Sequence, residues 1–134
     1  MVRYTTDTLP DEADVIALYR ANGWSSAEEP VKLMAALGNS DHLVCAYDAA
    51  RLVGLANAIS DGSLVVYYPH LLVLPQYQGS GVGRQLMALQ MEHYKDFHQH
   101  TLLAVAEAAS FYERVGFEKA DGIVAMWVYE GGDH

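Results

Sequence analysis

The sequence predicts a mixed α/β (α+β) fold in which a largely antiparallel, twisted sheet of roughly six to seven strands is flanked by about four helices. Two observations lead to this fold class. Short apolar runs rich in Val, Leu and Tyr alternate with segments of helical periodicity. Three such runs also follow one another between residues 42 and 74 with no helix between them. This order favours an antiparallel meander over the strict strand-helix alternation of a doubly wound sheet.

The first forty residues contain one expected strand and two expected helices. Residues 2–5 form a short apolar run, and residues 8–11 supply turn chemistry before the first helix. That helix has apolar side chains on one side and ends at Asn22-Gly23; the apolar positions are Val15, Ile16, Leu18 and Tyr19. The second helix is expected over about residues 27–37, with Pro30 in its first turn and Gly38 after its last.

The remaining chain supplies the other elements in order. Residues 42–47, 52–59 and 64–74 are the three strands of the meander, separated by turn sequences at 48–50 and 60–63. A helix is expected over 84–97, a strand over 101–105, a short helix over 108–115 that Gly116 closes, and a last strand over 123–129. Because no repeat or linker-like run divides the chain, a single domain over residues 1–134 is expected.

Composition excludes several classes of function. The formal net charge of −9 opposes the phosphate contacts on which nucleic-acid affinity depends, so no nucleic-acid partner is expected. No stretch approaches the roughly 18 apolar residues of a membrane span, and the first residues lack the apolar core of a signal peptide. We therefore expect no membrane partner and a cytoplasmic location.

Cysteine and histidine usage points away from thiol and metal chemistry. The single cysteine, Cys45, lies inside the apolar run 43–47 and is expected to pack as a small buried side chain. His93, His98 and His100 lack the i, i+4 spacing of a helical metal-binding pair. We expect no metal.

The most informative stretch is residues 71–84, which read as a strand ending at Pro75, a glycine-rich loop and the start of a helix. Glycines let a ligand approach the backbone closely, and the unpaired N–H groups of a first helical turn suit a diphosphate. A P-loop is excluded because no lysine follows Gly83. A dinucleotide fingerprint is disfavoured because the preceding strand belongs to a meander. The pattern that remains is Gln78-x-x-Gly81-x-Gly83.

With this pattern, the sequence resembles the GCN5-related N-acetyltransferase (GNAT) family. That family has [RQ]-x-x-G-x-[GA] after a strand ending in V-x-P, as in Val73-Leu74-Pro75 here. Downstream, Phe111-Tyr112 followed by Gly116-Phe117 resembles the family's F-Y-x-x-x-G-F helix. The resemblance covers about residues 42–129, whereas the first forty residues match only in their number of helices.

The resemblance implies acetyl-CoA (coenzyme A) as co-substrate. Backbone groups of Leu71, Leu72 and Val73 would meet the pantetheine arm, and an N–H near Val73 would face the oxygen that gains charge during transfer. Arg84 is either a charge partner of a phosphate or a solvated surface residue, and both interpretations stay open. The residues implied to hold the pyrophosphate are Gln78, Gly79, Ser80, Gly81, Val82 and Gly83, with Arg84.

The resemblance also places a tyrosine, here Tyr112, near the sulfur of coenzyme A, where a phenol can protonate the departing thiolate. The alternative for Tyr112 is simple core packing. An alkylammonium must lose a proton before it attacks, and His70 is the preferred base or substrate contact because of its ordinary pKa near 6.5. Tyr67, Tyr68 and Glu107 are rivals, with Tyr68 and Glu107 also candidate substrate contacts. Trp24 either lines the acceptor pocket or packs in the core.

We therefore expect an N-acetyltransferase that moves the acetyl group of acetyl-CoA to a primary amine by direct attack in a ternary complex. A small amine or polyamine is favoured as the small-molecule substrate, because the chain is acidic and rich in tyrosine. Three alternatives stay open: a protein N-terminal or lysine acetyltransferase, a non-catalytic acyl-CoA-binding or sensing module, and a nucleotide-binding protein. The apolar run 123–129 is also suited to pairing across a homodimer.

Overall fold

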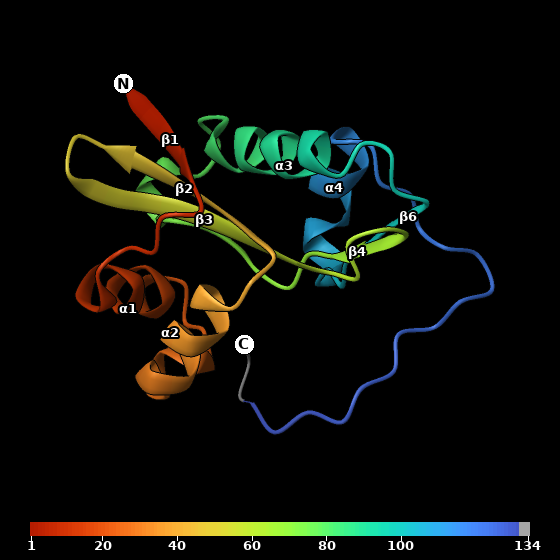
Figure 1. The fold of residues 1–134 in the computed structure, drawn as a ribbon, viewed down its shortest axis with the longest axis horizontal. Coiled ribbons are helices and arrows are strands. Elements are labelled where there is room, and N and C mark those ends of the chain that lie inside the picture. Colours follow the sequence, from red (N-terminus) through yellow and green to blue (C-terminus); the bar gives the residue numbers. More distant parts are fainter. Residues whose placement is uncertain (132–134) are drawn as a thin grey trace.

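A computed structural model of the chain describes residues 1–131 and shows a six-stranded sheet with helices on both faces (Figure 1). The strands are β1 (Val2–Thr6), β2 (His42–Asp48), β3 (Arg51–Ser60), β4 (Val65–Tyr67), β5 (Leu71–Val73) and β6 (Gln99–Thr101). The α-helices are α1 (Glu12–Ala21), α2 (Pro30–Gly38), α3 (Val82–His93) and α4 (Ala109–Arg114). Three short 3-10 turns complete the described elements: η1 (Ser25–Glu28), η2 (Pro75–Tyr77) and η3 (Ala106–Ala108). The predicted fold class is confirmed.

The sheet has the order β1-β2-β3-β4-β6, and β5 pairs with β3 beside β4. Every pair is antiparallel except β4 with β6, which is parallel. The predicted meander is thus present, but its third strand, expected over 64–74, is two strands. Pro69 explains the break, because a residue without an N–H interrupts a hydrogen-bonded ladder. The break leaves His70 between β4 and β5.

The strands on either side of this break, β4 and β5, pair with different parts of the sheet. β4 pairs with the end of β3 and with β6, whereas β5 pairs with residues 54–56 of β3. Within residues 1–131, β5 has no strand on its other side. The sheet therefore opens between β5 and the segment that follows β6.

The final predicted strand is wrong for the described structure. Residues 123–129 belong to no strand, and Figure 1 shows this part of the chain leaving the body of the molecule as an extended chain. The preceding expected strand, 101–105, is also displaced, because β6 ends at Thr101. An apolar run alone does not make a strand, since its N–H and C=O groups need a neighbouring backbone to pair with.

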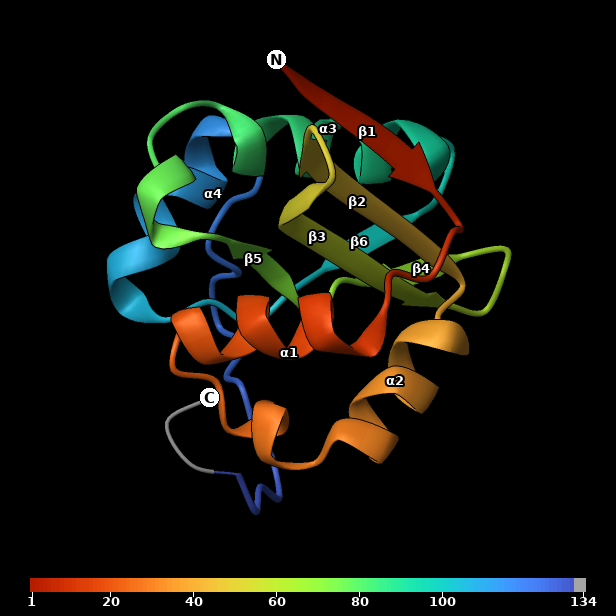
Figure 2. The same cartoon turned by 90° about the vertical axis from the view of Figure 1, so that its left-hand side faces the viewer.

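The core lies on both faces of the sheet. Helices α1 and α3 lie on opposite faces of the sheet (Figure 2), and Leu18 of α1 and Leu86 of α3 are both fully buried. Gly54 of β3 allows α3 to approach closely, since a Cβ there would lie 2.9 Å from the Leu72 carbonyl oxygen and 3.1 Å from Leu86 Cδ1. Cys45 is buried in β2, as predicted. No helix within residues 1–131 has the length and apolar character that a membrane crossing requires.

Candidate functional site

The glycine loop between η2 and α3 has the backbone geometry of an anion site. Gly79 and Gly81 have φ values of +80° and +93°, a left-handed conformation that favours glycine. Gly81 stands at the N-cap position of α3 and has no side chain with which to cap it. An added Cβ at either glycine would meet nothing within 4 Å, so the space outside the loop is open to a ligand. The residues present therefore fit a bound diphosphate.

Gly83 joins this loop to α4. A Cβ on Gly83 would lie 3.4 Å from Phe111 Cζ and 3.6 Å from Val73 Cγ2. These are ordinary van der Waals distances, so the first turn of α3 lies directly against both α4 and β5. The motif thus places α4, which carries Tyr112, against the glycine loop.

The side chain of Gln78 binds the protein framework. Its Nε2 donates to the Val73 carbonyl oxygen at 3.1 Å and to Asn22 Oδ1 at 3.3 Å. Asn22 Nδ2 in turn donates to the same Val73 oxygen at 3.2 Å and to the Leu18 carbonyl oxygen at 3.0 Å. These bonds connect the loop, β5 and the end of α1. Gln78 was expected on the pyrophosphate, and Asn22 was expected only as the end of a helix.

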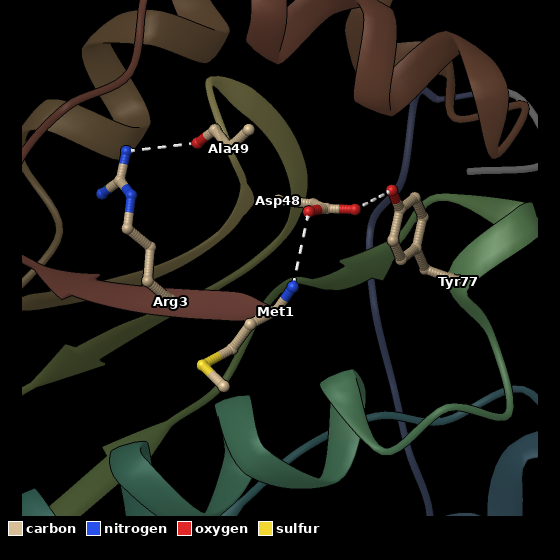
Figure 3. Close-up of polar contacts among 5 residues, drawn as sticks. All are labelled: Met1, Arg3, Asp48, Ala49 and Tyr77. Carbon is tan, nitrogen blue, oxygen red and sulfur yellow. Dashed lines mark hydrogen bonds and ion pairs between the residues drawn. The ribbon is translucent and has the colours of Figure 1, made fainter.

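Tyr77 fixes the start of the loop to the turn between β2 and β3 (Figure 3). Its hydroxyl donates to Asp48 Oδ2 at 2.5 Å, and this bond raises the Tyr77 pKa above its usual value. The other Asp48 oxygen lies 3.9 Å from the amino group of Met1. Arg3 Nη2 donates to the Ala49 carbonyl oxygen at 3.5 Å across the same turn (Figure 3). The loop is therefore held at both ends, by Tyr77 and by Gly83.

Within residues 1–131, the outer edge of β5 beside this loop has no neighbouring strand. The Leu74 N–H donates to the Val53 carbonyl, and the His70 carbonyl accepts from the Asn57 N–H. The backbone groups of these two residues, which flank β5, therefore point toward β3. Because backbone groups alternate along a strand, those of Leu71 and Val73 face the opposite side. The Val73 carbonyl there accepts the two side-chain bonds described above, while its N–H points the same way. Leu72 faces β3 and is buried.

Three aromatic rings meet at the break between β4 and β5. The Tyr19 hydroxyl lies 2.7 Å from His70 Nδ1, and the Trp24 ring centroid lies 5.0 Å from that of His70. Tyr19 and Trp24 also pack edge to face at 5.7 Å. Asn57 fixes the His70 backbone, because its Oδ1 accepts the His70 N–H at 3.0 Å. The structure thus brings together two predicted residues, Trp24 and His70.

Tyr19 is the member of this cluster that the sequence analysis missed. It is fully buried, and burial raises its pKa well above the usual value, which keeps it a neutral phenol. The sequence carried one signal: Tyr19 and Asn22 are three residues apart and therefore share a helix face. Both side chains of that face point toward the site.

Tyr112 is half-buried on α4, with its ring 5.0 Å from Phe111 and 6.0 Å from Phe117. Burial raises its pKa above that of an exposed phenol, so it carries a proton at neutral pH. Glu107 is exposed in η3, on the segment that leads into α4. Arg84 is exposed in the first turn of α3 and forms no ion pair with a residue in the described range.

Tyr68 lies apart from the Tyr19–Trp24–His70 cluster. It is buried, its hydroxyl lies 2.8 Å from His100 Nδ1, and its ring packs near Tyr94 and Phe117. The substrate role of Tyr68 stays a prediction, as does that of Glu107.

Two other features lie outside this site. A surface hollow of about 410 Å³ lies between α1, η1 and α2, and none of the predicted site residues lines it. In the described part of the chain, no group of three or more His, Cys, Asp or Glu side chains is placed to hold a metal ion. The expectation of no metal stays a prediction.

Proteins with a similar structure are acetyltransferases. A GNAT family acetyltransferase from Streptococcus pneumoniae TIGR4 superposes with a TM-score of 0.84 at 30% identity, covering 96% of this chain and 98% of that one. A probable acetyltransferase of unknown function from meticillin-resistant Staphylococcus aureus gives 0.82 at 28% identity, covering 97% and 100%. The aminoglycoside N-acetyltransferase AAC(6')-Iy, solved with CoA, gives 0.72 at 15% identity over 96% of this chain and 95% of that one, which shows a shared fold alone.

Comparison of the sequence with known families identifies the family of this chain. The family described as "Acetyltransferase (GNAT) domain" matches residues 15–125, and the chain belongs to it. A soybean (Glycine max) protein named histone acetyltransferase TAP1 is 33% identical over 134 aligned residues, covering 89% of this chain and 57% of its own. An uncharacterized N-acetyltransferase, ycf52, from Gracilaria tenuistipitata var. liui is 35% identical over 58% of this chain and 44% of its own. The chain thus spans about half the length of these relatives.

Proposed function

We propose that this chain transfers the acetyl group of acetyl-CoA to a primary amine by direct attack while both substrates are bound. The observation that carries the proposal is one juxtaposition. Gly83 lies beside Phe111 and Val73, which brings together the glycine loop, β5 and the helix of Tyr112. A diphosphate, a pantetheine arm and a departing sulfur require these three features in this order.

The cofactor would be held chiefly by backbone. We assign the pyrophosphate to the N–H groups of residues 79–84 at the start of α3, with Arg84 as the nearby positive charge. The outer edge of β5, at Leu71 and Val73, would pair with the amide groups of pantetheine as an added strand does. Gln78 would act indirectly, through its bonds to Val73 and Asn22.

The chemistry needs a proton acceptor, a proton donor and a dipole. Acetyl-CoA supplies an acyl group activated as a thioester. His70 would first take a proton from the bound ammonium, and the free amine would then attack the thioester carbonyl carbon. As the carbon–sulfur bond breaks, Tyr112 would give its proton to the leaving sulfur, and the second proton released from nitrogen would restore the Tyr112 phenol. The Val73 N–H faces the side on which the carbonyl oxygen gains charge. Cys45 takes no part, because it is buried in the core.

The aromatic cluster supports a small amine or polyamine as the acceptor. Trp24 and His70 lie at the end of β5 opposite the glycine loop, and aromatic faces attract ammonium groups. The formal charge of −9 favours the approach of a cation. The AAC(6')-Iy enzyme of similar fold acts, by its name, on aminoglycosides, which are polyamines.

A protein lysine or N-terminal amine is the second candidate acceptor. The observation in its favour is the similarity to the soybean protein named histone acetyltransferase TAP1, which extends over 89% of this chain. A non-catalytic acyl-CoA-binding module would have the same loop but would need neither Tyr112 nor His70.

Release of free thiol from acetyl-CoA tests the proposal. The panel holds polyamines, arylalkylamines and aminoglycosides in one arm and lysine-containing or free N-terminal peptides in the other. We expect turnover in the small-amine arm to exceed that of the peptide arm. Faster turnover of peptides would move the assignment to a protein acetyltransferase. Binding of acetyl-CoA with no turnover in either arm would indicate a binding module.

A further inference from the structure

Asn57 is a buried polar residue in an otherwise apolar stretch of β3. Residues 52–58 are all buried, and Asn57, which is 3% exposed, is the only one of them with a polar side chain. Burying an amide costs free energy unless its donor and its acceptor both find partners. The partners of the Asn57 side chain therefore indicate what it does.

Asn57 lies opposite the break between β4 and β5. The β3 pairings on either side of the break are Ile59 with Tyr67 and Ala56 with Leu71. Two residues of β3, 57 and 58, therefore face three residues, 68–70, of the segment that contains His70. One surplus residue of this kind makes a β-bulge, which bends a strand and redirects its side chains. The geometry of the bulge thus determines where the His70 ring points.

The Asn57 side chain replaces one backbone bond of the ladder. Opposite residues of a hydrogen-bonded antiparallel pair exchange two backbone bonds. Here the Asn57 N–H donates to the His70 carbonyl oxygen at 3.2 Å, but the His70 N–H donates to Asn57 Oδ1 at 3.0 Å. The side-chain oxygen reaches farther than a backbone carbonyl and spans the bulge. Asn57 therefore holds both backbone polar groups of His70.

Ser40 fixes the orientation of this amide. The Ser40 hydroxyl donates to the Ala36 carbonyl oxygen of α2 at 2.8 Å and accepts from Asn57 Nδ2 at 3.0 Å. At the other end of the amide, a backbone N–H can only donate, so the atom that faces His70 must be the oxygen. Both contacts require the same amide orientation. The end of α2 is thus connected to His70 through Asn57.

We propose that Asn57 is a positioning residue for acetyl transfer. It acts through the backbone of His70 and keeps the His70 ring beside Tyr19 and Trp24, in the place where it meets the amine. The inference rests on the function proposed above, in which His70 takes a proton from the bound ammonium. Without the side-chain bond, residues 68–70 are free to shift. A displacement of about 1 Å at a reacting group lowers a rate by as much as about a hundredfold.

Thiol release by Asn57→Leu and Asn57→Asp tests this role. Leucine has a similar size but no acceptor, whereas aspartate keeps an oxygen for the His70 N–H. We expect Asn57→Leu to lower kcat by about tenfold to a hundredfold with the KM for acetyl-CoA unchanged, and Asn57→Asp to recover most of this loss. Gln90→Leu is the matched control, because the Gln90 amide is fully buried and donates to the carbonyl oxygens of His42 and Ala56. This control loses stability but keeps kcat.

Ser40→Ala is a milder second variant, because Ser40 is partly exposed and its loss leaves the bond to the His70 N–H in place. It frees the amide to turn, and kcat should fall by a factor of roughly two to twelve, the equivalent of one hydrogen bond. It carries the activity test if Asn57→Leu does not fold. An unchanged kcat in Asn57→Leu, an equal fall in Gln90→Leu, or an unchanged kcat in Ser40→Ala would overturn the proposal.

Nuclear magnetic resonance separates this proposal from the function on which it rests, because it needs no turnover. The His70 amide should exchange with deuterium about tenfold faster in Asn57→Leu than in the native chain or in Gln90→Leu. In the same variant, the contacts of the His70 ring with Tyr19 and Trp24 should weaken. Both changes in a chain that acetylates no amine would refute acetyl transfer and confirm that Asn57 places His70. Unaltered exchange and ring contacts in Asn57→Leu would refute the role of Asn57 itself.

Discussion

Replacing Tyr19 by phenylalanine removes only the hydroxyl that lies 2.7 Å from His70 Nδ1 and leaves the packed ring in place. Tyr19 is fully buried, so water does not readily replace the lost partner. A hydrogen bond of this kind contributes about 0.5–1.5 kcal/mol. If that bond orients His70 for proton transfer, its loss lowers kcat by a factor of roughly two to twelve, since about 1.4 kcal/mol corresponds to a tenfold change in rate. The KM for acetyl-CoA stays unchanged, because no contact of Tyr19 reaches the glycine loop.

The assay is thiol release under saturating acetyl-CoA and amine, with thermal unfolding measured in parallel. Tyr94→Phe is the matched control: Tyr94 is 2% exposed, and its hydroxyl donates to Asp41 Oδ2 at 2.5 Å, away from the site. Both variants lose stability, but only Tyr19→Phe should lose kcat. An equal fall of kcat in both variants, or an unchanged kcat in Tyr19→Phe, would refute a positioning role for the Tyr19 hydroxyl.

Three further groups of variants and one chemical probe test the rest of the reasoning. Tyr112→Phe should lower kcat by about a hundredfold or more while acetyl-CoA still binds, because general acid catalysis contributes on that scale. Since burial raises the Tyr112 pKa above the usual phenol value, loss of activity through ionisation of this group should occur at a higher pH than the ionisation of free tyrosine, and a pH profile of kcat that falls earlier would contradict this. Gly81→Ala should raise the KM for acetyl-CoA, because alanine resists a φ of +93°, whereas Gly62→Ala imposes the same strain at φ +81° in a distant turn and leaves KM unchanged. Burial raises the Cys45 pKa to about 12, so alkylation of the native protein at pH 8.5, followed by mass spectrometry, should be roughly a thousandfold slower than in urea; similar rates would contradict its burial. Leu86→Ala should lower the free energy of unfolding by about 2–5 kcal/mol in a urea titration, because Leu86 is fully buried between α3 and the sheet; a loss below about 1 kcal/mol would contradict that packing.

Much of the fold was predictable because its signals are local. The apolar side of α1, the meander from residue 42 onward and the burial of Cys45 follow from periodicity within short windows of sequence. The glycine loop was also predictable, since the glycines at 79 and 81 are needed for a backbone conformation that depends only on their immediate neighbours. The division of the third meander strand was missed although Pro69 marked it.

Other features depended on contacts between distant segments. Tyr19 and His70 are 51 residues apart, and Gln78 and Asn22 are 56 apart, so no local pattern relates them. The parallel pairing of β4 with β6 likewise joins strands separated by the whole of α3. Such contacts form only when the helices pack on the sheet. They place the Gln78 side chain against Val73 and Asn22, and they place the Tyr68 hydroxyl beside His100, apart from the Tyr19–Trp24–His70 cluster.

The sequence by itself determined the class of fold, the family and the glycine loop, because each rests on the conformational preferences of neighbouring residues. Only the tertiary structure decided which side chains surround His70, where the sheet opens beside β5, and that residues 123–129 form no strand. A strand exists only with a partner backbone, and no single segment of sequence specifies where that backbone will be.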